Sequence, residues 1–153
     1  MFPIVQPRHC YLICCDMKSS SVDIIDSAGD RVSIDNKYGK MPLIVRDMLV
    51  TFMKECGLEN KTTRAMAKAK PKRLNMDWRE AKSVFNYGIY TMRHMETYKG
   101  RGGRDWDCGL KPGETKQLTV LRHRYCHKIV TSMINELKDT NRLPTHEYDK
   151  KKK

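Results

Sequence analysis

Several features that would assign a function class directly are missing from this sequence. No apolar run is long enough to span a bilayer, and the first residues lack the apolar stretch of a secretory signal. The six cysteines show no secreted disulfide framework and no C-x-x-C spacing, and no DNA-binding motif has the required spacing. We therefore expect an intracellular protein, nuclear or cytoplasmic, with no membrane partner, no cofactor and no metal ion.

Acidic residues are also scarce, since 18 Asp and Glu stand against 30 Lys and Arg, which gives a net charge of +12. The basic residues concentrate in four segments, which are Lys61–Arg73, Lys99–Arg104, Arg122–Lys128 and Lys150–Lys153. One interpretation is that these segments form solvated faces and a disordered lysine tail. The other is that they attract an acidic partner, either a protein or nucleic acid bound without base specificity.

The clearest local pattern is a β-hairpin near the start of the chain. The apolar runs Tyr11–Cys15 and Val22–Ile25 flank the polar turn Lys18–Ser21. Folding back at this turn brings the end of the second strand alongside the start of the first. His9 and Asp26 should then lie close together across the ladder. A carboxylate that orients an imidazole is the base half of a catalytic triad, which also requires a nucleophile.

The remaining periodicity predicts an α+β fold, a small antiparallel sheet with packed helices. Apolar spacing predicts helices over Pro42–Cys56, Tyr87–Tyr98 and Glu114–Lys138. In the second of these we expect Ile89, Met92 and Met95 to face inward. Alternation over Arg73–Trp78 predicts a short strand, Lys61–Lys70 is helical or loose, and Gly100–Pro112 is a loop.

Several blocks occur in an order that points to one family. They are HCYLICCDM and IIDS in the hairpin, WREAKSVFNYGIYTMRHMETY from residue 78, and WDCGL from residue 106. Together they resemble the ubiquitin-like-protein-specific cysteine proteases, which include SUMO-deconjugating and adenovirus-protease-like enzymes, and especially the plant, transposon-associated branch. The resemblance runs from about Phe2 to about Leu137. It implies a cysteine-protease-like fold truncated at the N-terminus, with residues 1–143 as a partial catalytic domain and 144–153 as a basic tail.

The resemblance also implies a site. His9 is the base, Asp26 orients it, and the nucleophilic cysteine of a D-C-G motif begins a buried helix. Here that motif reads N-Y-G, so Tyr87 stands at the nucleophile position, and substrate contacts fall on Trp78 and Gly88. A phenol, with an ordinary pKa of roughly 10, cannot replace a thiolate, and losing a triad nucleophile typically lowers turnover by about six orders of magnitude.

A second D-C-G occurs at residues 107–109. We do not expect Cys108 to take over as nucleophile, because Pro112 and Gly113 follow and no helix begins at this cysteine to lower its pKa. The family's oxyanion-donor glutamine is also missing from Arg79–Asn86.

Two functions remain open. In the first, the chain is a cysteine-type peptidase domain by family, an isopeptidase for ubiquitin-like conjugates, and Tyr87 makes this domain inactive. Alternatively, it is a non-catalytic basic module that binds a ubiquitin-like modifier or nucleic acid. A transposon-derived product without a retained role is a third reading of the same residues.

Overall fold

The computed structural model describes residues 1–79, 86–103 and 106–137 of the chain. The chain divides into two compact units, Met1–Glu114 and Thr115–Lys153. The predicted boundary between residues 143 and 144, and the basic tail after it, lie outside the described residues. Among the described helices, none has both the length and the apolar character needed to cross a membrane.

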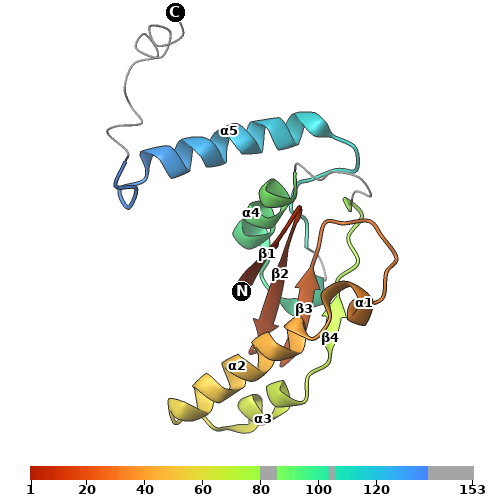
Figure 1. The fold of residues 1–153 in the computed structure, drawn as a ribbon, viewed down its shortest axis with the longest axis vertical. Helices are drawn as coiled ribbons and strands as arrows, with labels where there is room; N and C mark the ends of the chain where they lie inside the picture. Colours follow the sequence, from red (N-terminus) through yellow and green to blue (C-terminus); the bar gives the residue numbers. More distant parts are fainter. Residues whose placement is uncertain (80–85, 104–105, 138–153) are drawn as a thin grey trace, which may run out of the picture. The chain divides into compact units, whose positions relative to one another are not determined.

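The first unit holds most of the secondary structure (Figure 1). Its elements are β1 (Phe2–Gln6), β2 (His9–Asp16), β3 (Ser21–Ile25), α1 (Ile34–Tyr38), α2 (Met41–Glu55), α3 (Lys61–Ala67), β4 (Pro71–Arg73), α4 (Tyr87–Thr97) and the short 3-10 turn η1 (Arg101–Gly103). The second unit contains α5 (Thr115–Thr131). The α+β class predicted from periodicity is confirmed.

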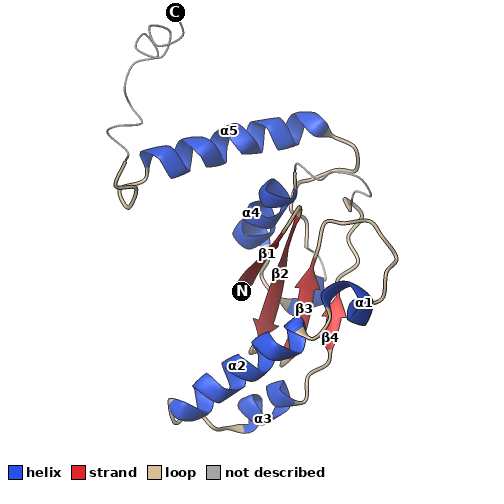
Figure 2. Cartoon of the chain, viewed as in Figure 1, coloured by secondary structure: helices blue, strands red, loops and turns tan. Residues whose placement is uncertain are grey.

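The sheet is mixed, and the expectation of a purely antiparallel sheet is wrong. Its order is β1-β2-β3-β4, with antiparallel neighbours through β3 and a parallel pairing of β3 with β4 (Figure 2). The parallel pairing arises because the chain crosses through α1, α2 and α3 before it returns beside β3. The hairpin turn is held by the Asp16 carboxylate, which accepts hydrogen bonds from the Lys18 backbone at 3.0 Å and the Ser19 hydroxyl at 2.8 Å.

The strand predicted over Arg73–Trp78 lies earlier, at Pro71–Arg73. The alternation that suggested it is an alternation of burial, since Leu74, Met76 and Trp78 are buried while the two residues between them are exposed. Only the Leu74 backbone continues the ladder, donating to Ile24 at 2.9 Å. An extended segment packed on the core therefore has the period of a strand without its hydrogen bonds.

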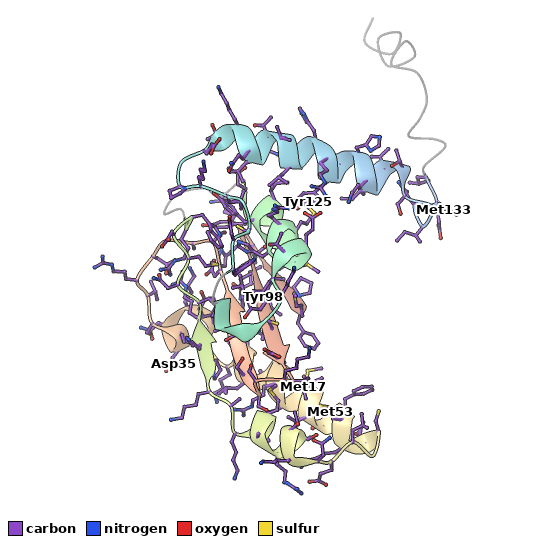
Figure 3. All side chains as sticks on the ribbon, turned by 180° about the vertical axis from the view of Figure 1, so that it is seen from behind. Met17, Asp35, Met53, Tyr98, Tyr125 and Met133 are labelled. Carbon is purple, nitrogen blue, oxygen red and sulfur yellow. The ribbon has the colours of Figure 1, made fainter. Side chains whose placement is uncertain are left out.

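Side chains of β2 and β3 alternate between two faces of the sheet. One face belongs to a buried cluster that joins both strands to α1, α2 and α3, comprising Tyr11, Ile13, Val22, Ile24, Tyr38, Val45, Val50 and Met66. On the other face, the Asp23 carboxylate accepts a hydrogen bond at 2.7 Å from the hydroxyl of Tyr98, the residue after α4 (Figure 3). The hairpin is thus held from both sides.

The predicted helices differ from the observed ones in detail. The first is confirmed within one residue, and Gly57 follows it with a positive φ of 73°, which suits a helix C-terminus. The inward residues of α4 are Ile89, Tyr90, Thr91 and His94, whereas Met95 is 42% exposed, so its inward assignment is wrong.

The last helix, α5, ends at Thr131 rather than Lys138. Its end is explained by Asn135, whose side-chain amide donates to the carbonyls of Ile129 and Val130, each at 3.1 Å. No prediction from the sequence covered β1 or α1. The latter begins where the Ser33 hydroxyl accepts from the Asn36 backbone at 3.3 Å.

Candidate functional site

His9 and Asp26 meet at one end of the hairpin. His9 is the first residue of β2, and Asp26 follows the last residue of β3 directly. The register pairs Leu12 with Ile25, so Asp26 stands opposite Tyr11, two residues from His9 on the same face. The His9 Nε2 atom lies 3.2 Å from Asp26 Oδ2, which confirms the proximity predicted from the hairpin.

The Asp26 carboxylate is completely buried, and its partners keep it ionised. Besides His9, it accepts hydrogen bonds from the Ala28 backbone at 2.8 Å and the Tyr38 hydroxyl at 2.5 Å, and it pairs with Lys37 Nζ at 2.9 Å. Burial by itself would raise the pKa of Asp26. The hydrogen bonds from His9, Tyr38, Ala28 and Lys37 outweigh burial and hold that pKa well below its usual range.

Two tyrosine rings fix the His9 imidazole. Tyr11 stacks on it, with ring centroids 5.6 Å apart, and Tyr87 meets it edge-on, with centroids 4.7 Å apart and planes at 85°. An ionised carboxylate only accepts hydrogen bonds, so His9 Nε2 carries the hydrogen toward Asp26, and Nδ1 is the nitrogen left to take a proton. Tyr87 is the first residue of α4. The three residues predicted as one site therefore lie together, while their roles as base, orienter and nucleophile position stay predictions.

Trp78 and Gly88, the predicted substrate contacts, have different surroundings. Trp78 is buried; its Nε1 donates to His94 Nε2 at 3.0 Å, and its ring meets Trp106 edge-on at 5.1 Å. It also borders a cavity of about 380 Å³. Gly88 is exposed in the first turn of α4. Within the described part of the chain, neither makes a hydrogen bond or ring contact with His9, so their substrate role stays a prediction.

His94 serves the packing of α4. Burial lowers its pKa to about 4, so the imidazole is neutral near pH 7 and its Nε2 accepts the Trp78 hydrogen bond. Trp106 meets the same imidazole edge-on at 5.3 Å. In the sequence, His94 falls in one of the blocks on which the resemblance rests, and the structure adds its aromatic partners.

Three charged residues near Asp26 were missed by sequence reasoning. Lys37 of α1 forms ion pairs with both Asp26 and Asp30. Arg73 of β4 lies 3.0 Å from Asp30 through Nη1 and 3.6 Å from Asp26 through Nη2. These three residues lie up to 47 positions from Asp26 along the chain, and no local spacing marks them as its neighbours.

Burial makes the thiols of four of the six cysteines harder to ionise. Burial raises the pKa of Cys14 to about 11 and also raises the pKa values of Cys10 and Cys15. Cys108 is fully buried, and its pKa is likewise raised by burial. Among the residues that the structure describes, no group of three or more His, Cys, Asp and Glu side chains is arranged to hold a metal ion.

Comparisons of this chain with protein-family models, with curated proteins and with solved structures find no match.

Proposed function

We propose that this chain is a catalytically inactive domain of the ubiquitin-like-protein-specific cysteine protease type, nuclear or cytoplasmic, which binds an acidic ubiquitin-like modifier or its conjugates without cleaving them. One observation carries the proposal: the Tyr87 ring lies 4.7 Å from an imidazole that is itself paired with the buried carboxylate of Asp26. An imidazole paired in this way beside the start of a helix suits a cysteine nucleophile. A tyrosine at that point supports an origin in a protease whose chemistry has been lost.

Hydrolysis is not expected, for two reasons. The phenol of a tyrosine ionises far less readily than a thiol, at a pKa of roughly 10 against 8.5, and is a weak nucleophile. In the proposed site, the Tyr87 ring beside His9 would also take the space that a substrate carbonyl needs. Cys14 and Cys108 are no substitutes, because burial raises the pKa of both thiols.

The test of inactivity uses the purified chain. A ubiquitin-like modifier with a C-terminal fluorogenic amide should release no fluorophore above the buffer rate, and a vinyl-sulfone probe of the same modifier should label no cysteine. Cys108→Ser is the control variant and should behave like the parent chain. Probe labelling that disappears in Cys108→Ser would contradict the proposal, because the second D-C-G would then act as the nucleophile.

The binding half of the proposal rests on exposed charge in the first unit. Five basic side chains of α3 and the segment after it are exposed, and we call them the α3 basic surface: Lys61, Arg64, Lys68, Lys70 and Lys72. In the described part of the chain none of them forms an ion pair with an acidic residue. Their charge is therefore available to steer and hold an acidic protein.

The surface can be tested against a charge-matched control. Reversal of Lys61, Arg64 and Lys68 to glutamate should weaken binding of an acidic modifier roughly tenfold or more. The control variant reverses Arg122, Arg124 and Lys128 of α5, which changes the net charge equally. Equal losses in both variants would show that the total charge, rather than the α3 basic surface, attracts the modifier.

A second candidate, nucleic-acid binding, is favoured by the same surface. It predicts that short duplex DNA competes with the modifier and that the α3 reversal weakens DNA binding alike across sequences. If DNA binds and no ubiquitin-like modifier does, the non-catalytic nucleic-acid module is the correct function.

A further inference from the structure

The buried carboxylate of Asp26 has more partners than His9. Its Oδ2 receives His9 Nε2 at 3.2 Å, the Tyr38 hydroxyl at 2.5 Å and Lys37 Nζ at 2.9 Å. Arg73 Nη2 lies 3.6 Å from the same atom. Four donor groups thus converge on one oxygen, which offers about two lone-pair sites. His9 is therefore one of four groups that share the Asp26 Oδ2 atom.

The two cations also bind a second carboxylate. Lys37 pairs with Asp30, and Arg73 Nη1 lies 3.0 Å from Asp30 Oδ1. Two carboxylates and two cations carry a total charge of zero before His9 ionises. The side chains of Lys37 and Arg73 are only 13% and 10% exposed, and that of Asp26 is 0% exposed, so solvent screens these three weakly, whereas the Asp30 side chain is 36% exposed.

This charge count matters for nucleophile chemistry. A cysteine beside a histidine becomes reactive when its thiol proton moves to the imidazole, and the carboxylate behind the histidine stabilises the resulting imidazolium. The stabilisation requires carboxylate charge that other cations have not offset. A protonated His9 would be a third cation around Asp26 and Asp30.

We propose that Lys37 and Arg73 convert Asp26 from an orienter of His9 into the centre of a charge-neutral structural cluster, so that the site has lost its base function as well as its nucleophile. The inference rests on the proposed function, because it treats His9 and Asp26 as the base half of a former triad. Tyr87→Cys alone then yields a thiol whose ionisation gains nothing from His9. Tyr87→Cys combined with Lys37→Met frees one carboxylate charge, and the introduced thiol passes its proton to His9 Nδ1.

The experiment measures how fast iodoacetamide alkylates the introduced thiol between pH 5 and pH 10. Peptide-level mass spectrometry separates this thiol from the six native cysteines. In Tyr87→Cys the rate should fall tenfold for each pH unit below the pKa of the introduced thiol, and adding His9→Ala should not change that profile. With Lys37→Met added, the rate at pH 6.5 should rise about tenfold, which corresponds to about one pKa unit.

Three further variants make the result specific to the cluster. Lys40→Met removes an exposed lysine close to Lys37 along the chain and should leave the alkylation profile of Tyr87→Cys unchanged. His9→Ala, added to the double variant, should abolish the gain, because the proton then has no acceptor. Lys37→Gln removes the charge but keeps a donor for Asp26, so it replaces Lys37→Met if circular dichroism shows that the methionine variant unfolds.

Two outcomes would overturn the proposal. In one, Tyr87→Cys alone reacts quickly at pH 6.5 and His9→Ala slows that reaction, which would mean that Asp26 still supports an imidazolium. In the other, folded Lys37→Met and Lys37→Gln variants give no gain over Tyr87→Cys. Both results concern the introduced thiol and His9, and neither requires a modifier. They are therefore distinguishable from a failure of modifier binding.

Discussion

At the scale of single residues, Asp26 shows how a charge is kept in a protein interior. Its carboxylate is fully buried, and hydrogen bonds and cations occupy both oxygens. Breaking a buried ion cluster by removing one partner leaves the others uncompensated, which is more costly than losing an exposed pair. The carboxylate therefore stabilises the junction of β3, α1 and β4, whatever its role toward His9.

We predict that Asp26→Asn lowers the free energy of unfolding by about 3 to 5 kcal/mol, because Lys37 and Arg73 lose a buried counter-charge. Urea unfolding followed by circular dichroism measures the change. Asp77→Asn, at an exposed carboxylate, is the matched control and should alter stability by no more than about 0.5 kcal/mol. A loss for Asp26→Asn as small as the control's would show that the cluster contributes little.

Asp26 also gives stability a pH dependence of known sign. Its pKa in the folded state lies below that of an unfolded aspartate, about 3.9, so its contribution is present above pH 4 and is lost as the pH falls further. We predict that the stability difference between the parent chain and Asp26→Asn shrinks as the pH falls from 5 to 3. A constant difference over that range, in urea titrations, would contradict the depressed pKa.

At the scale of elements, the sequence predicted best what depends on local pattern. The hairpin and α2 follow from apolar spacing and from Pro42 and Gly57, which bracket α2. The hairpin in turn placed His9 beside Asp26, so half of the candidate site could be predicted from periodicity. The contact of Tyr87 with His9 is non-local, and only the resemblance indicated it.

What could not be predicted depends on pairing across long stretches of chain. The strand β4 has three residues and pairs in parallel with β3 across α1, α2 and α3, so no local signal gives its register. Lys37 and Arg73 reach Asp26 only through that crossover. The inward assignment in α4 is confirmed for Ile89 and wrong for Met95; polar His94 is buried instead, and a buried indole donates a hydrogen bond to it.

The buried imidazole of His94 in α4 predicts that the protein loses stability in acid. The pKa of His94 is lowered to about 4 by burial, against about 6.5 in an unfolded chain. The unfolded state therefore binds a proton first as the pH falls, and stability should drop by about 3 kcal/mol between pH 7 and pH 4. Urea unfolding across this range measures the slope. His94→Gln should remove this loss of stability. The control His123→Gln, at an exposed histidine of α5, should keep it. An unchanged slope in His94→Gln would refute the lowered pKa of His94.

At the scale of the whole molecule, the net charge of +12 favours association with acidic partners, and the proposed function implies that the Tyr87 ring opposes insertion of an extended modifier tail. These two effects depend on salt differently. Exposed charges are screened over about 8 Å at physiological ionic strength, whereas a tail held by backbone hydrogen bonds is much less sensitive. Binding to the exterior and binding in the site can therefore be separated by a salt series.

We predict that the parent chain binds an acidic ubiquitin-like modifier weakly and loses most of that affinity between about 50 and 200 mM salt. Tyr87→Gly removes the ring from beside His9, so it should add a component of binding that persists at high salt. Tyr87→Phe keeps the ring and should add none, and a modifier lacking its last two glycines should gain nothing from either variant. Calorimetric titrations at several salt concentrations provide the measurement. Equal affinities for Tyr87→Gly and Tyr87→Phe at high salt would mean that the ring does not obstruct the tail, and the remaining binding would then belong to the exterior charge alone.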